Sequence, residues 1–120
     1  MPRDYSAYLK DILEAIRKIE KYRKGLSYDD FVKDELVQDA IVRNLELLGE
    51  ASKNIPEHVR KKSPDVEWRK LAGLRDILIH AYFGIDTVVV WDVVEKKIPE
   101  LKKKISSLLS QIPGRLRESD

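Results

Sequence analysis

The sequence predicts an all-α protein, and three observations support this fold class. First, apolar side chains recur at three- and four-residue steps along most of the chain, which is the period of one helix face. Second, residues that cap or end helices stand between these periodic segments. Third, the one stretch with the composition of a strand, residues 87–94, would have no partner strand in an otherwise helical chain.

Local signals set the boundaries of the expected helices. Asp4 and Ser27 can cap the first two, Gly25 can end the first, and Pro56 suits the first turn of a short helix. In chain order, the expected helices are residues 4–24, a stretch that begins near residue 28, residues 34–54, residues 56–62, residues 65–83, and a last helix over residues 87–112 that Pro99 interrupts or kinks.

The segment 65–83 differs from the others because two adjoining faces are apolar. One line consists of Leu71, Leu74, Leu78 and Ala81, and the other consists of Trp68, Ala72 and Ile79. A helix that is apolar on more than one side packs on more than one side. We therefore expect this helix at the centre of the fold, with Gly84 ending it.

The next segment, residues 87–94, is rich in valine, so β-propensity alone would favour a strand. We expect a buried helix there instead, capped by Asp86, because a lone strand would lack a partner. The length of 120 residues suits one domain. We place that helical domain at residues 1–112, and we expect residues 113–120 to form a short flexible tail.

Composition excludes several classes of function. Lys and Arg outnumber Asp and Glu by only 23 to 21, so any anion-binding site must be local. The absence of cysteine excludes disulfides, thiolate metal ligands and a cysteine nucleophile. The two histidines, His58 and His80, begin no ligand cluster, so we expect no metal and no cofactor. With no signal segment and no apolar run of about 20 residues, the sequence predicts a cytoplasmic protein without membrane contact.

Four polar side chains stand out within residues 75–82 of the expected helix 65–83, where the other residues are apolar, namely Arg75, Asp76, His80 and Tyr82. On a continuous helix, Asp76 would lie one turn from His80 and could orient it. Arg75 and Tyr82 would lie only about 20° apart around the axis, but Arg75 and His80 about 140° apart. Side chains reaching around the helix could still meet in a cleft. We favour a two-fold symmetric dimer, which would bring both residues of both subunits together.

This set of side chains can perform a narrow range of chemistry. Histidine can take a proton from a ribose 2′-hydroxyl or give one to a leaving oxygen. Arginine can hold a phosphate and stabilise charge that develops on it. The two suffice for metal-independent cleavage of RNA, because only RNA carries that internal nucleophile.

Structural interpretations of the same residues remain open on spacing alone. Arg75 and Asp76 could form an interhelical ion pair, His80 could be a structural residue, and Tyr82 could be a core aromatic. Two other functions are therefore also possible: a non-catalytic module that binds a nucleotide or a partner protein, and a purely structural helical dimer.

Beyond spacing, the chain resembles the HepT-like toxins of the HEPN superfamily (the DUF86 family). The segment Arg75-Asp76-Ile77-Leu78-Ile79-His80-Ala81-Tyr82 matches that family's Arg-x4-His-x-Tyr motif. Further matches are Leu48-Gly49-Glu50-Ala51 before Asn54-Ile55-Pro56, Trp68, Tyr82-Phe83-Gly84-Ile85-Asp86, and Trp91 before Pro99. The resemblance covers nearly the whole chain.

The resemblance implies an antiparallel up-and-down bundle of four to five main helices with a short connecting helix, which dimerises around a composite ribonuclease site. It implies that Arg75 and His80 are catalytic and that Asp76 supports them. It also implies a partner, a minimal nucleotidyltransferase antitoxin of the MNT type, which transfers AMP from ATP to Tyr82. The added phosphodiester would occupy the place of the RNA phosphate beside Arg75.

Overall fold

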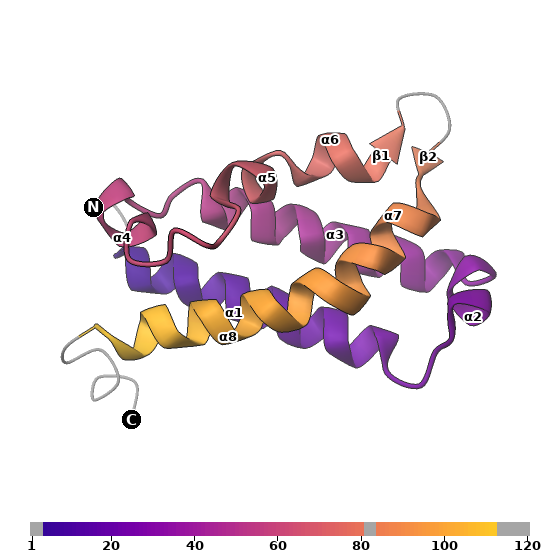
Figure 1. Ribbon diagram of the computed structural model, residues 1–120. Coiled ribbons are helices and arrows are strands. Elements are labelled where there is room, and N and C mark those ends of the chain that lie inside the picture. The colour runs from indigo at the N-terminus through magenta and orange to yellow at the C-terminus, as the bar shows by residue number, and fades with distance from the viewer. Residues whose placement is uncertain (1–3, 81–83, 113–120) are drawn as a thin grey trace.

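The computed structural model describes residues 4–80 and 84–112, and it confirms the all-α fold class (Figure 1). The helices are α1 (Tyr5–Arg23), α2 (Tyr28–Val32), α3 (Glu35–Ser52), α4 (Glu57–Arg60), α5 (Trp68–Ala72), α6 (Leu74–Leu78), α7 (Thr87–Asp92), the π-helix η1 (Val93–Lys97) and α8 (Ile98–Ser110). Two short strands, β1 (Ile79–His80) and β2 (Gly84–Ile85), lie between α6 and α7. None of the helices within the described residues is long and apolar enough to cross a membrane.

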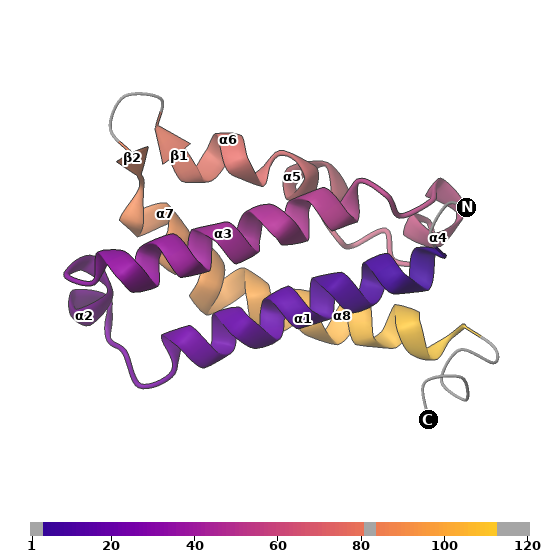
Figure 2. The same cartoon turned by 180° about the vertical axis from the view of Figure 1, so that it is seen from behind.

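The main helices form an antiparallel up-and-down bundle, as expected. Helices α1 and α3 run side by side in opposite directions, and the α7–η1–α8 rod crosses them (Figures 1 and 2). Helices α5 and α6 lie along one edge of the bundle, next to α3. The predicted boundary between a domain at 1–112 and a tail at 113–120 stays a prediction, because the tail lies outside the described residues.

The first helices begin where their capping residues predict. Asp4 accepts a hydrogen bond from the amide of Ser6 at 2.9 Å, which satisfies one of the free donors at the start of α1. Ser27 and Asp30 form a reciprocal capping box at the start of α2. These bonds are local in sequence, which explains why the sequence predicts them.

The core lies between α1, α3 and the α7–η1–α8 rod. Its largest fully buried side chains are Phe31, Leu9, Ile12, Ile16, Ile19, Ile41, Leu45, Leu48, Ile55, Leu78, Ile98 and Ile105. The buried amide of Gln38 donates to the carbonyl oxygens of Phe31 and Val32 at 2.8 and 3.0 Å. The amide nitrogen of this buried side chain thus bonds carbonyl oxygens at the end of α2.

The valine-rich segment is a helix, as expected. Asp86 caps α7 by accepting from the amide of Val89 at 3.2 Å, and Val90 is buried. The chain then widens into the π-helix η1 just before Pro99, which occupies the first turn of α8. Because proline lacks an amide donor and its ring crowds the preceding turn, a wider turn accommodates it. The predicted interruption at Pro99 is confirmed.

The prediction of one continuous helix over residues 65–83 is wrong. The segment is divided into α5 and α6 at Gly73, and α6 ends at Leu78. Beyond that point the backbone pairs with another segment: Ile79 is opposite Ile85 and His80 is opposite Gly84, while the amide of Asp86 donates to the carbonyl of Leu78 at 3.0 Å. Gly84 therefore does not end a helix, but lies in β2 with a positive φ of 75°.

The expected central position of this segment is also wrong. Helix α5 has no buried residue, and only Leu74 and Leu78 are buried in α6. The second apolar line is only partly covered, with Trp68 and Ala72 half-buried. The segment forms an outer layer on α3, and α1 and α3 occupy the centre.

Candidate functional site

Helix α6 presents Arg75 and Asp76 on the surface of the molecule. The side chain of Arg75 is 77% exposed, and its Nε lies 3.9 Å from Oε2 of Glu46 on α3. Asp76 is also exposed, while the neighbouring Leu74 and Leu78 point into the core. The alternation follows from the helical period: apolar residues four apart anchor α6 and leave its other face to the charged residues.

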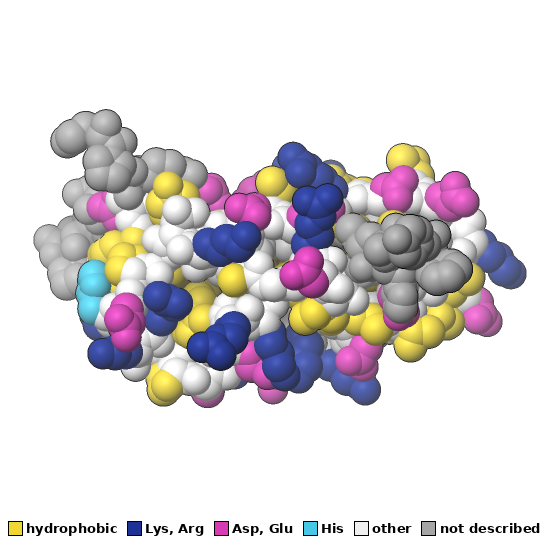
Figure 3. Space-filling model, turned by 90° about the horizontal axis from the view of Figure 1, so that it is seen from above, with side chains coloured by type: hydrophobic (Ala, Val, Ile, Leu, Met, Phe, Trp, Pro, Cys, Tyr) yellow, Lys and Arg dark blue, Asp and Glu magenta, His cyan; other side chains and the backbone are white. Residues whose placement is uncertain are grey.

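A cleft of about 310 Å³ separates α6 from α3 beside these two residues. Its lining is formed by one face of α3 and by the junction between α5 and α6, namely Arg43, Glu46, Leu47, Gly49, Glu50, Lys53, Ala72, Gly73, Leu74, Arg75 and Asp76. Figure 3 shows acidic and basic side chains interspersed over the face of the molecule that carries α5 and α6. The cleft is therefore a mixed-charge site.

Gly49 sets how closely the outer layer approaches α3. A Cβ atom at this position would lie 2.7 Å from the carbonyl oxygen of Leu71, a distance that real Cβ atoms essentially never show. The absence of a side chain thus allows the backbone of α5 to lie directly against α3. Because Leu71 precedes Arg75 by only four residues, this contact also restricts where the motif begins.

His80 lies beyond the end of α6, and the structure describes its backbone but not its side chain. That backbone belongs to β1 and is paired with Gly84. The expected one-turn spacing between Asp76 and His80 is therefore wrong, because the helix ends at Leu78. The expected relation of Arg75 to His80 on one continuous helix fails for the same reason. Tyr82 itself lies outside the described residues.

The charges of the cleft are partly compensated. Lys53 pairs with Glu50 at 3.1 Å, and Arg75 lies near Glu46. Arg43 is exposed and has no ion pair or hydrogen bond to any residue that the structure describes. Among the described residues, no group of three His, Cys, Asp or Glu side chains is placed to hold a metal ion.

Sequence reasoning missed the contact of Glu46 with Arg75. The sequence places Glu46 three residues after Arg43 and four before Glu50, so the three lie on one face of α3. That spacing is the only signal in the sequence, and it does not show which helix this face meets. The proximity of Glu46 to Arg75 is a tertiary contact.

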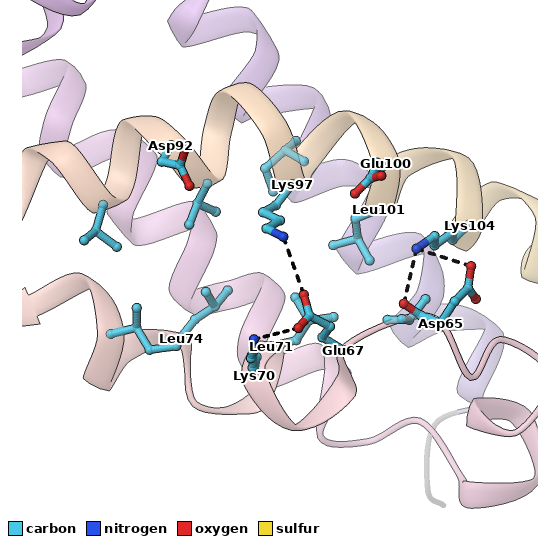
Figure 4. A pocket seen from close by; sticks show the side chains of 15 residues that line it. Asp65, Glu67, Lys70, Leu71, Leu74, Asp92, Lys97, Glu100, Leu101 and Lys104 are labelled. Carbon is cyan, nitrogen blue, oxygen red and sulfur yellow. Dashed lines mark hydrogen bonds and ion pairs between the residues drawn. The ribbon is translucent and has the colours of Figure 1, made fainter.

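A second groove, of about 320 Å³, lies on the other side of α6, facing the α7–η1–α8 rod. Figure 4 shows its apolar side chains, among them Leu71, Leu74 and Leu101, beneath a rim of ion pairs. In that rim, Lys70 and Lys97 lie 2.7 and 3.7 Å from Glu67, and the Lys70 ammonium in particular holds the pKa of Glu67 below its ordinary value.

The two tryptophans and His58 contact neighbouring residues of the fold. Trp91 packs on Phe31 with ring centroids 5.2 Å apart, and Arg23 lies 5.1 Å over its ring. The indole of Trp68 donates to the carbonyl of Ser63 at 3.1 Å. His58 is exposed, with its ring edge-on to Tyr5.

A helical bundle with an exposed arginine beside a charged cleft, on the helix that leads to a histidine, agrees with the HEPN-like class that the motif predicts. Sequence comparison identifies the family: residues 12–108 match the model described as ribonuclease HepT-like. The chain belongs to the ribonuclease HepT-like family, as its motif predicts.

Curated relatives of similar length support this assignment. One, from Thermococcus cleftensis and named "Probable ribonuclease HepT", is 46% identical over 90% of this chain and 98% of its own length. A "Putative RNase" of Methanocaldococcus jannaschii is 42% identical over 94% of this chain and 93% of its own. Another "Putative RNase", of Caldanaerobacter subterraneus, is 43% identical over 87% and 93%. No solved structure matches the chain.

Proposed function

We propose that the protein is the toxin of a HepT/MntA-type toxin–antitoxin system and a metal-independent endoribonuclease. Arg75 and His80 are its catalytic residues, and Asp76 supports them. The observation that carries the proposal is the exposed guanidinium of Arg75, which stands at a charged cleft on the helix that leads into His80. Membership of a ribonuclease family, with relatives named as ribonucleases, supports the reaction class.

The proposed reaction uses the RNA's own nucleophile. His80 takes the proton of the 2′-hydroxyl as that oxygen attacks the neighbouring phosphorus. The bond from phosphorus to the 5′-oxygen breaks, and the leaving oxygen takes up a proton from the acid form of an imidazole or from water. The products are a 2′,3′-cyclic phosphate and a 5′-hydroxyl. Arg75 stabilises the negative charge that builds on the phosphate oxygens.

We also propose that the working unit is a homodimer. Two apolar side chains near the motif are left in solvent, Ile77 on α6 at 44% exposure and Val88 on α7 at 64%. A second subunit that covered them would remove apolar surface from water. A two-fold axis at this face would place two copies of the motif next to one another.

Regulation is proposed to act at Tyr82 through an MNT-type nucleotidyltransferase antitoxin in the cytoplasm. The tyrosine oxygen attacks the α-phosphorus of ATP, pyrophosphate leaves, and the phenolic proton passes to solvent or a base on the antitoxin. Tyr82 lies in sequence between the paired residues His80 and Gly84, two positions from the proposed acid–base group. The attached AMP would bring a negative phosphodiester to the site that RNA phosphate must enter.

The ribonuclease proposal is tested with purified protein and single-stranded RNA in the presence of EDTA. The wild type is expected to cut the RNA without metal and to leave cyclic phosphate ends. His80→Ala should slow cleavage by at least about 100-fold, the usual contribution of acid–base catalysis. A wild-type protein that does not cut RNA at any concentration would favour a non-catalytic binding module instead.

The modification is tested by co-expression with the partner nucleotidyltransferase and mass spectrometry of the intact toxin. We expect a mass gain in whole AMP units and a parallel loss of RNA cleavage. Tyr82→Phe should gain no AMP, while Tyr22→Phe on α1 serves as the control and should gain it normally. A Tyr82→Phe protein that still gains AMP would refute the assignment of this residue.

A further inference from the structure

Arg43 is the basic residue of the cleft whose charge is least compensated. Lys53 is paired with Glu50, and Arg75 lies near Glu46, whereas Arg43 makes no ion pair or hydrogen bond to the rest of the chain as far as the structure describes it. It is exposed and lines the cleft. A solvated guanidinium without a carboxylate partner is available to bind an anion.

The direction of the helices places Arg43 toward the histidine end of the motif. Helix α3 runs antiparallel to α6, and α6 leads into β1 (Figure 1). Arg43 precedes Glu46 by three residues, which is about 4.5 Å along the α3 axis. Glu46 lies opposite Arg75. Arg43 therefore lies about one helical turn from that contact, in the direction of β1, which contains His80.

We propose that Arg43 is a second phosphate-binding residue, which grips a phosphate next to the one that is cut. This inference rests on the proposed ribonuclease function. An RNA strand lying in the cleft would then be held at two points, by Arg75 at the reacting phosphate and by Arg43 on its neighbour. The forked guanidinium suits this role, because it donates two parallel hydrogen bonds to phosphate oxygens.

The balance of charge in the cleft explains why one arginine matters for binding. The lining contains Arg43, Lys53 and Arg75 against Glu46, Glu50 and Asp76, so its formal charge is zero. The whole chain carries only +2, so it offers RNA little general attraction. Removal of Arg43 would leave the cleft net negative, which repels a phosphate strand.

The test measures binding apart from cleavage, in an inactive His80→Ala background with a labelled single-stranded RNA. The Arg43→Gln substitution is expected to weaken binding by about tenfold, which corresponds to a lost charged hydrogen bond. The slope of log Kd against log salt should also become shallower by about 0.7, the loss of one phosphate contact on a single strand. Arg43→Lys, which keeps the charge, should restore the slope and only part of the affinity.

Arg60→Gln is the matched control. Arg60 is an exposed arginine on α4 outside the cleft, so its substitution removes the same charge and should leave the salt slope unchanged. In the active protein, Arg43→Gln should raise KM with little change in kcat, because the residue contacts a phosphate that does not react. An equal loss in both variants would show general charge attraction and overturn the proposal.

Other outcomes separate this inference from the function on which it rests. If the wild type cuts RNA and Arg43→Gln changes neither Kd nor the salt slope, only the role of Arg43 falls. If Arg43→Gln changes the oligomeric mass, the residue belongs to a subunit interface and the proposal is overturned. If the wild type neither binds nor cuts RNA, both proposals fall together. A thermal unfolding curve that matches the wild type shows that the variant is folded.

Discussion

The bundle and the outer layer of this protein are built differently. Helices α1 and α3 have 19 and 18 residues, begin with capping side chains, and bury six and nine residues, respectively. Helices α5 and α6 have five residues each, and α5 buries none of them. The proposed catalytic Arg75 lies in the second region, although the first contains most of the core.

This difference indicates a division of tasks between the two regions. Burial of apolar side chains stabilises the bundle, so most of the folding free energy must come from there. The outer layer is anchored at a few points, such as Leu74, Leu78 and the contact of Leu71 with Gly49. Its exposed charged side chains, among them Arg75 and Asp76, are accessible to a substrate. Substitutions in the bundle should therefore mainly lower stability, and substitutions in the outer layer should mainly lower activity.

The largest effect on stability is expected from a cavity in the bundle. Leu45 is fully buried on α3, and Leu45→Ala should lower the free energy of unfolding by about 2–5 kcal/mol. Leu36→Ala, at an 80% exposed position of the same helix, is the control and should change it by less than about 0.5 kcal/mol. Urea unfolding followed by circular dichroism measures both. Equal losses would contradict the assignment of the core.

A substitution at the junction of the two regions should affect both properties. Gly49→Ala places a methyl group against the backbone of Leu71 and should destabilise the protein by about 1–3 kcal/mol. It should also reduce RNA cleavage in the molecules that remain folded, because the layer that carries Arg75 is displaced.

Gly73→Ala is the matched control for the junction. A Cβ atom there would meet nothing closer than 3.6 Å, and its φ of −97° suits any residue. Unfolding should therefore be unchanged. A Gly49→Ala protein as stable as Gly73→Ala would show that the close approach does not constrain the layer.

A smaller effect on stability is expected at the start of α7, where the chain passes from the outer layer to the bundle. Asp86 caps α7, so Asp86→Ala should cost about 1 kcal/mol of stability. Asp86→Asn, which can still accept the bond from Val89, should keep most of it. Thermal unfolding of the two variants provides the measurement, and identical losses in both would point to a role of the charge rather than of the cap.

The smallest effect concerns pH and lies in the bundle. The amide and hydroxyl of Ser27 hold the pKa of Asp30 below its ordinary value of 3.8. The charged carboxylate is thus favoured in the folded state, so its contribution is complete above pH 3.8 and is lost as the pH falls through the lowered pKa. Asp30→Asn should be slightly less stable than wild type at neutral pH and approach it in acid. Asp29→Asn, which removes the same charge outside the capping box, is the control in urea unfolding.

The same division explains what could be predicted from the sequence. The starts of α1 and α2 depend on Asp4 and Ser27, whose bonds reach only two or three residues along the chain. The helix after Asp86 is predictable because its cap is local and the sequence contains no second segment with the composition of a strand. Helix caps and the helical state of this segment therefore depend on residues that are close together in the sequence.

The outer layer could not be predicted in the same way. The apolar period over residues 65–83 suggests one helix, but the backbone of Leu78 bonds to Asp86, eight residues away. The proximity of Glu46 to Arg75 also depends on how α6 lies on α3. The sequence identifies the motif residues, whereas their positions in space depend on contacts between distant segments.

The most direct test of this account measures cleavage and stability together for Arg75→Ala. Because Arg75 is exposed and only loosely paired, the free energy of unfolding should change by less than about 0.5 kcal/mol. RNA cleavage should fall by about 100-fold or more, since the charge that stabilises the reacting phosphate is gone. Cleavage at the wild-type rate, or a loss of several kcal/mol in stability, would contradict the account.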